Sequence, residues 1–200
     1  MAVIVAGEYN LDLEYVDMGG GYYGGVKGKP DFRDYVPAIA EVLSEKFDVS
    51  KTKLIMEPGV SMVSSSFDFV TSVIDTKQVR EHTYVVIDGS RVNLNPQVTR
   101  RQYLHRFEYK NEENRDIVPV QTICGATCME YDRLFPAENE RKLEPGDRVI
   151  FTNAGGYTIC LTPLFIHYFP AVYVKKKDGS LFVAREPWTN DEYMAKNRFE

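Results

Sequence analysis

The chain has 200 residues, which suits one domain or two small ones, because domains mostly hold about 100–150 residues. Hydrophobic residues make up 44% and charged residues 26%, a globular mix that excludes a disordered tail, a collagen and a coiled coil. The net charge of −5 leaves no positive surplus to neutralise phosphates, which argues against a nucleic-acid partner. A complete (β/α)8 barrel typically needs about 250 residues, so the chain is too short to hold one.

In the first third, the spacing predicts a strand at 11–17, a helix from about residue 31 to Phe47, and a strand at 53–56. Pro37 is awkward within that helix, because proline removes a backbone donor unless it lies in the first turn. Strand, loop, helix and strand in this order are typical of a parallel βαβ unit.

The remainder is rich in β-branched and aromatic residues and predicts an antiparallel β domain. An Asp-Gly hairpin turn at 177–180 precedes the last expected strand, and residues 108–120 look like a polar connector. The boundary between the two parts is expected at about residues 60–70. The strands expected after it are 67–79, 84–88, 148–152, 157–162, 171–177 and 181–183.

The number of cysteines and the hydropathy of the chain indicate its cellular compartment. Cys124, Cys128 and Cys160 are too few, and odd in number, for a disulfide scaffold, so free thiols in a reducing cytosol are expected. Cys124 and Cys128 are spaced as CxxxC, but no second cysteine or histidine pair completes a zinc site, so no metal is expected. The apolar N-terminus lacks the basic start of a signal sequence, and no stretch approaches the roughly 20 apolar residues of a membrane span. A cytoplasmic chain with no membrane partner is predicted.

Three short segments could carry chemistry. Gly19-Gly20-Gly21 follows a strand and precedes a helix, where it could cradle a phosphate or form only a flexible loop. Glu57 stands at the carboxyl end of the next strand, where it could hold a cationic ring nitrogen, act as a base, or cap a turn. The glycine pair before Tyr157 suits a small anion or a tight turn.

Taken in order, six segments resemble the fold-type III pyridoxal-phosphate decarboxylases, the family of ornithine, diaminopimelate and related amino-acid decarboxylases. The resemblance spans essentially the whole chain and corresponds to the carboxyl-terminal half of such an enzyme. It implies an α+β, mainly β fold: residues 1–66 would be the last strands of a TIM-type α/β barrel, and residues 67–200 an antiparallel β-sandwich or barrel domain. The segments are MGGGY (18–22), EPG (57–59), VVIDGS (85–90), CGATCMEYD (124–132), EPGDRVIFTNAGGYTI (144–159) and FPAVYV (169–174).

The resemblance implies a site for pyridoxal 5′-phosphate. Glu57 would pair with the protonated pyridine nitrogen and keep the ring an electron sink. Cys128 would return a proton to the substrate α-carbon, acting across a homodimer interface in the partner's active site. The cofactor phosphate would be held by Gly19, Gly20, Gly21, Gly59 and Tyr157.

Three departures from the family pattern qualify this assignment. The family usually has EPGR with the arginine on the phosphate, but here the position is Val60. The residue after the cysteine is commonly an acid that receives a substrate amino group, but here it is Met129, so substrate specificity does not transfer. Arg100 and Arg101 lie where relatives contact the far end of the substrate, so an acidic substrate end is conceivable.

The third departure concerns the Schiff-base lysine, which in the family precedes the glycine run. The first lysine here is Lys27, so the chain alone is expected to be inactive. The leading hypothesis is the carboxyl-terminal portion of a pyridoxal-phosphate amino-acid decarboxylase, either a fragment or one half of a split enzyme that pairs with an N-terminal half. The alternative is a non-catalytic homologue that binds or regulates a full-length decarboxylase. A ligand-binding β module unrelated to decarboxylation is a third possibility, which the ordered motifs disfavour.

Overall fold

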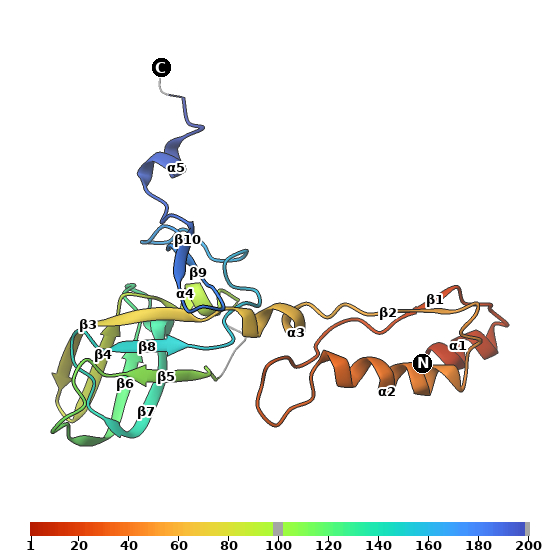
Figure 1. Ribbon diagram of the computed structural model, residues 1–200, viewed down its shortest axis with the longest axis horizontal. Helices are drawn as coiled ribbons and strands as arrows, with labels where there is room; N and C mark the ends of the chain where they lie inside the picture. The colour runs from red at the N-terminus through yellow and green to blue at the C-terminus, as the bar shows by residue number, and fades with distance from the viewer. Residues whose placement is uncertain (98–101, 199–200) are drawn as a thin grey trace.

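The computed structural model of the protein describes residues 1–97 and 102–198. Its main body is one six-stranded sheet with the strand order β5-β8-β3-β4-β6-β7 (Figure 1). Adjacent strands run antiparallel except β4 and β6, which are parallel. The six strands are β3 (Phe69–Val79), β4 (His82–Ile87), β5 (His105–Glu108), β6 (Ile117–Cys124), β7 (Arg133–Arg141) and β8 (Arg148–Phe151).

The sheet curls until its two outer strands face each other across an aromatic core. His105 of β5 and Phe135 of β7 have ring centroids 4.2 Å apart, although these strands stand at opposite ends of the strand order. Tyr103 packs edge-on against Phe151 of β8, with centroids 5.9 Å apart. Packed rings therefore hold the curled body together across its open side. The buried aliphatic residues that complete this core are Val73, Val85, Ile87, Leu94, Ile123, Leu134, Ala137, Leu143, Val149 and Ala154.

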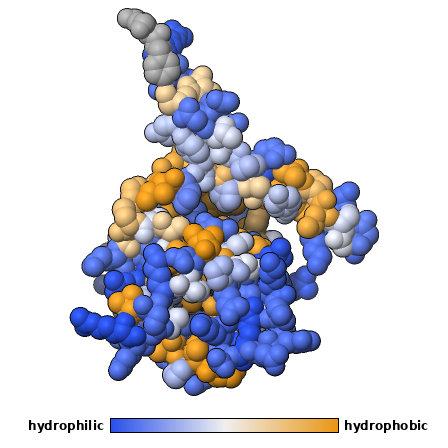
Figure 2. All heavy atoms as spheres, turned by 90° about the vertical axis from the view of Figure 1, so that its left-hand side faces the viewer, coloured by the Kyte–Doolittle hydropathy of each residue, from blue (hydrophilic) through white to orange (hydrophobic). Residues whose placement is uncertain are grey.

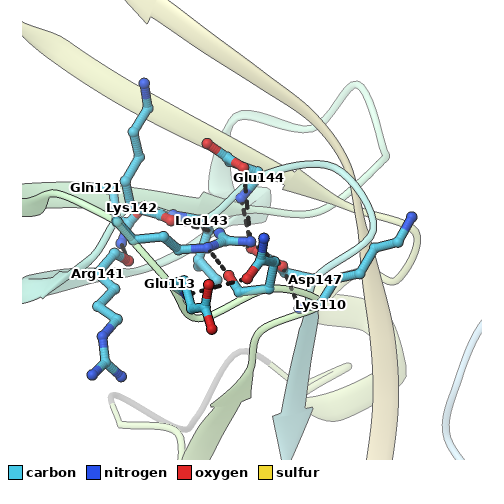
Figure 3. A network of polar contacts seen from close by, with 10 residues as sticks. Lys110, Glu113, Gln121, Arg141, Lys142, Leu143, Glu144 and Asp147 are labelled. Atoms are coloured by element: carbon cyan, nitrogen blue, oxygen red, sulfur yellow. Dashed lines mark hydrogen bonds and ion pairs between the residues drawn. The ribbon is translucent and has the colours of Figure 1, made fainter.

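A buried ion pair fixes the turn that enters β8 (Figure 3). The Asp147 side chain is fully buried and accepts two hydrogen bonds from the Arg115 guanidinium, of 2.5 and 2.9 Å. Its carboxylate also accepts the backbone N–H groups of Lys110 and Glu144, at 2.9 and 2.8 Å. A buried carboxylate needs such partners, because an unpaired charge in the interior is costly. The network ties the 109–116 segment to the hairpin between β7 and β8.

The N-terminal part projects away from the sheet body, to the right in the view of Figure 1. It comprises helix α1 (Ala2–Glu8), a two-stranded parallel sheet of β1 (Tyr15–Asp17) and β2 (Lys53–Ile55), and helix α2 (Phe32–Ser44) between the strands. Asp31 caps α2 by accepting the Arg33 N–H at 2.7 Å. The expected βαβ unit is thus confirmed. Its helix includes Pro37, and its strands are shorter than predicted.

Two short helices, α3 (Val60–Val63) and the 3₁₀ turn η1 (Ser64–Ser66), join this N-terminal part to β3. Helix α4 (Arg91–Leu94) lies after β4, and the 3₁₀ turn η2 (Glu130–Asp132) precedes β7. The C-terminal hairpin of β9 (Val172–Lys175) and β10 (Leu181–Arg185) and helix α5 (Asn190–Met194) extend away from the body. Hydrophilic side chains cover most of the body seen in Figure 2, and hydrophobic ones gather just below this extension.

Several expectations for the β region need correction. The sheet is mixed rather than purely antiparallel, because the crossover between β4 and β6 contains α4 and β5 and returns the chain in the same direction. Residues 157–162 form turns instead of a strand, since the Thr158 carbonyl accepts the Leu161 and Thr162 N–H groups. The polar connector ends early, where β6 begins at Ile117. The sequence reading also missed β7, in which charged side chains interrupt the apolar pattern.

Candidate functional site

The glycine run and the Glu-Pro-Gly turn meet at one edge of the β1–β2 sheet. The two strands are parallel, with Asp17 opposite Ile55, so both carboxyl ends lie on the same side. The Met18 N–H donates to the Ile55 carbonyl at 3.0 Å, and the Glu57 N–H donates to the Gly19 carbonyl at 2.8 Å. These bonds extend the strand pairing into the loops and place Gly19 directly beside Glu57.

Steric and backbone constraints explain why each residue of the run is a glycine. A Cβ at Gly20 would lie 2.6 Å from the Glu57 carbonyl oxygen, so a side chain does not fit there. Gly19 and Gly21 have φ angles of +64° and +89°, in the region that favours glycine. A Cβ at either of these two would meet no atom within 4 Å, so open space borders the loop. An anion can approach such a loop closely where backbone N–H groups face it, but the Gly19 N–H is already donated to Asp17 Oδ1 at 2.8 Å.

A second loop brings a phenolic hydroxyl to the same place. Gly59 has a φ angle of +42°, and a Cβ there would lie 3.9 Å from both the Tyr157 hydroxyl oxygen and the Glu57 carbonyl oxygen. The Tyr157 side chain is 58% exposed, so its hydroxyl is accessible to a ligand. The loop after β8 thus reaches the loop after β2, about 100 residues earlier in the chain.

Close backbone packing holds this second loop in position. Asn153 Nδ2 donates to the Gly25 carbonyl at 2.9 Å, which links the loop to the segment after the glycine run. A Cβ at Gly155 would lie 2.0 Å from the Val63 carbonyl oxygen, and one at Gly156 would lie 2.9 Å from Val60 Cγ2. The glycine pair therefore lets the backbone pack directly on α3. The sequence motif at 144–159 includes Asn153, but no separate role was predicted for this residue.

A cavity of about 190 Å³ adjoins Tyr157. Val60, at the start of α3, supplies an apolar wall at the position where the resemblance leads one to expect an arginine. The site therefore offers backbone groups, glycines, a hydroxyl and the Glu57 carboxylate. These groups suit the phosphate and ring nitrogen of pyridoxal phosphate, without a guanidinium at residue 60. The cavity is lined by Val60, Leu94, Asn95, Pro96, Gln97, Gly156 and Tyr157.

Cys128 lies elsewhere, on the loop between β6 and η2 that packs against α4. Its side chain is exposed. Cys124, at the end of β6, is half-buried, and burial raises the pKa of its thiol. Met129 is half-buried next to Cys128, and its carbonyl accepts the Asp132 N–H at 3.0 Å. Arg100 and Arg101 lie outside the described residues.

Neither a metal centre nor a membrane-spanning helix emerges from the described residues. Across 1–97 and 102–198, no group of three or more histidine, cysteine or acidic side chains could hold a metal ion. Within the same ranges, none of the helices combines the length and hydropathy that crossing a bilayer requires.

Comparison with known proteins assigns the family. Residues 15–155 match the family model described as "Pyridoxal-dependent decarboxylase, C-terminal sheet domain". The chain belongs to this decarboxylase family. The match includes the glycine run, the Glu-Pro-Gly turn, the Cys128 loop and β8. The expected resemblance to fold-type III decarboxylases is therefore confirmed.

Among decarboxylase relatives, diaminopimelate decarboxylase of Aquifex aeolicus is 24% identical over 177 residues, which are 88% of this chain and 41% of the relative. Antizyme inhibitor 2 of Xenopus laevis is 27% identical over 176 residues, covering 80% of this chain and 38% of that protein. The crystal structure of diaminopimelate decarboxylase from M. jannaschii superposes with a TM-score of 0.73 at 25% identity. It covers 100% of this chain and 46% of that one. The chain thus spans less than half the length of these three proteins.

Proposed function

We propose that this chain forms the carboxyl-terminal portion of a pyridoxal-phosphate-dependent amino-acid decarboxylase. Residues 1–66 would belong to its α/β barrel and residues 67–200 to its sheet domain. The observation that supports this most directly is the meeting of Gly19, Glu57 and Tyr157, which come from three separate loops. In decarboxylases of this family the cofactor withdraws electrons from the substrate as CO2 leaves.

In this proposal the loops divide the work of holding the cofactor. The cofactor phosphate would lie against the backbone of Gly19, Gly20 and Gly21 on one side. Gly59 and the Tyr157 hydroxyl would contact it from the other side. The Glu57 carboxylate would accept a hydrogen bond from the protonated ring nitrogen, which keeps the ring positively charged. Residue 60 is a valine instead of the family's arginine, so only uncharged donors, backbone N–H groups and the Tyr157 hydroxyl, would hold the phosphate. The negative charge of the phosphate would therefore be compensated less than in the family.

Cys128 acts apart from these loops, as the group that returns a proton to the substrate. It would serve the active site of a second copy, which makes a homodimer part of the mechanism. Its exposed position on the sheet body is compatible with presentation to another subunit. The amino-acid substrate stays unassigned, because Met129 replaces the acidic residue that the family commonly uses.

The 200-residue polypeptide by itself should not turn over amino acids, because no lysine precedes its glycine run. Titration of the chain with pyridoxal phosphate, followed by amide NMR, tests the cofactor site. We expect shifts at Gly19–Gly21, Gly59 and Tyr157, and weaker shifts with pyridoxal, which lacks the phosphate. Tyr157→Phe removes only the hydroxyl and should reduce the preference for the phosphate form. Shifts confined to other segments, or CO2 release by the isolated chain, would refute the assignment.

A second candidate is a non-catalytic homologue that binds a full-length decarboxylase. Two observations favour it: Val60 stands at the position of the phosphate-binding arginine, and one relative bears the name of an inhibitor rather than an enzyme. Co-purification with a full-length relative, with a changed turnover of that relative, would support this candidate. Absence of a complex at micromolar concentrations would exclude it.

A further inference from the structure

A buried carboxylate lies beneath the loop that carries Cys128. The Asp132 residue is only 2% exposed, although an ionised side chain in the interior needs several partners. Its Oδ1 accepts the Arg91 N–H at 2.6 Å. Its Oδ2 accepts the Ser90 hydroxyl at 2.9 Å, and the Thr127 N–H and hydroxyl at 3.1 and 2.5 Å. One side chain therefore ties the start of α4 to the Cys128 loop.

The loop is shaped to fit this carboxylate. A Cβ at Gly125 would lie 2.3 Å from Asp132 Oδ2, so only glycine lets the loop close over the carboxyl group. The Gly125 N–H donates to the Asp132 carbonyl at 2.8 Å, and the Ala126 N–H donates to the Gly89 carbonyl at 2.9 Å. The Thr127 hydroxyl in turn accepts the Met129 N–H at 3.4 Å. The residues on both sides of Cys128 are thus linked to Asp132.

We infer that Asp132 is a positioning residue that fixes the 125–131 loop on α4 and thereby determines where Cys128 stands. This inference rests on the proposed function only for its consequence, the placement of a proton-donating thiol. The anchoring itself follows from the contacts of Asp132 and does not depend on that function. Asp132 lies four residues after Cys128 in the motif CGATCMEYD, a spacing that sequence analysis did not connect with a role.

Asp132→Asn tests the anchor with almost no change in shape. The two carboxylate oxygens each accept a backbone N–H, so the amide NH2 must face the N–H of Arg91 or of Thr127 in either orientation. Leaving such a buried donor without an acceptor should speed hydrogen exchange of the Gly125 and Thr127 amides about tenfold. The readout is amide exchange by NMR on the 200-residue chain, which needs no cofactor.

Thiol alkylation gives a second readout that includes its own reference. Cys128 and Cys160 are both exposed, so iodoacetamide modifies both, and peptide mass spectrometry gives the two rates separately. Asp132→Asn should change the ratio of the Cys128 rate to the Cys160 rate at least about threefold, because thiol reactivity follows the surroundings of the sulfur. Asp147→Asn is the matched control, since Asp147 is equally buried and also accepts backbone N–H groups. It should leave that ratio and the Gly125 exchange unchanged.

Thr127→Val is a milder variant that keeps the side-chain shape, but it removes the hydroxyl that donates to Asp132 and accepts the Met129 N–H. It should shift exchange and alkylation in the same direction as Asp132→Asn, by a smaller factor. Unchanged exchange and alkylation in a folded variant, or equal effects from Asp147→Asn, would overturn the inference. Failure of the proposed function is seen separately: Cys128→Ala would then leave decarboxylation by the assembled enzyme unaltered, whatever Asp132 does to the loop.

Discussion

Gly20→Ala should separate the glycine run from the Glu-Pro-Gly turn. The new Cβ would lie 2.6 Å from the Glu57 carbonyl oxygen, whereas ordinary contact begins at 3.4 Å, so the backbones must part by about 0.8 Å. Taken along the bond from the Glu57 N–H to the Gly19 carbonyl, now 2.8 Å, this shift gives about 3.6 Å, which is no longer a hydrogen bond. Such overpacking costs about 1–3 kcal/mol.

Amide NMR on the 200-residue chain measures this effect. Exchange of the Glu57 amide should accelerate about tenfold, because about 1.4 kcal/mol corresponds to a factor of ten in the opening equilibrium. Pyridoxal phosphate should then cause smaller shifts at Gly19 and Gly59. Gly7→Ala is the control, since a Cβ at Gly7 meets nothing within 4 Å and the residue lies in α1. A folded Gly20→Ala chain with unchanged Glu57 exchange would show that the steric reasoning is wrong.

Three further predictions concern stability and reactivity. Arg115→Met leaves the buried Asp147 carboxylate without its cation and should lower the free energy of unfolding by about 3–5 kcal/mol, measured by urea denaturation. Arg148→Met, which breaks an exposed ion pair, is the control and should change that free energy by less than about 1 kcal/mol. Pro37→Ala restores a donor inside α2 and should increase the helical circular dichroism signal; no increase would mean that Pro37 already fits the helix without cost. Burial raises the pKa of the Cys124 thiol, so its alkylation should reach half its maximal rate above pH 9.0. Because the folded-state pKa of Cys124 is the higher one, its contribution to stability is fully present below the unfolded-state pKa and should be lost as pH rises through the folded-state pKa. An alkylation midpoint at or below pH 9.0 would contradict both statements.

The sequence predicted the local elements whose signals are short-range. The spacing of residues from about 31 to Phe47 indicated α2, and the Asp-Gly turn at 177–180 indicated the β9–β10 hairpin. The order of the motifs indicated the family, because six segments in one sequence order constrain identity more strongly than any single motif does. The roles of Cys128 and of the individual cofactor-site residues remain predictions.

Long-range pairings were beyond the reach of sequence patterns. Nothing in the alternation of residues indicates that β4 pairs in parallel with β6, since that choice depends on how the crossover packs. The strand β7 was missed because its exposed face carries charges and only Leu134 and Ala137 are buried. The turns at 157–162 were mistaken for a strand, because their β-branched residues instead cap backbone groups, as the Thr158 hydroxyl does for Ala154.

The sequence by itself determined which chemical groups are available: three glycines, a carboxylate before Pro-Gly, a tyrosine after a glycine pair, and a cysteine. The tertiary structure decided which of these meet. Parallel pairing of β1 and β2 brings Gly19 to Glu57, and the packing of Gly155 and Gly156 on α3 brings Tyr157 to Gly59. It also decided that Asp132 is buried under the Cys128 loop. Such meetings depend on backbone approach between distant segments, which the one-dimensional pattern of residue types does not contain.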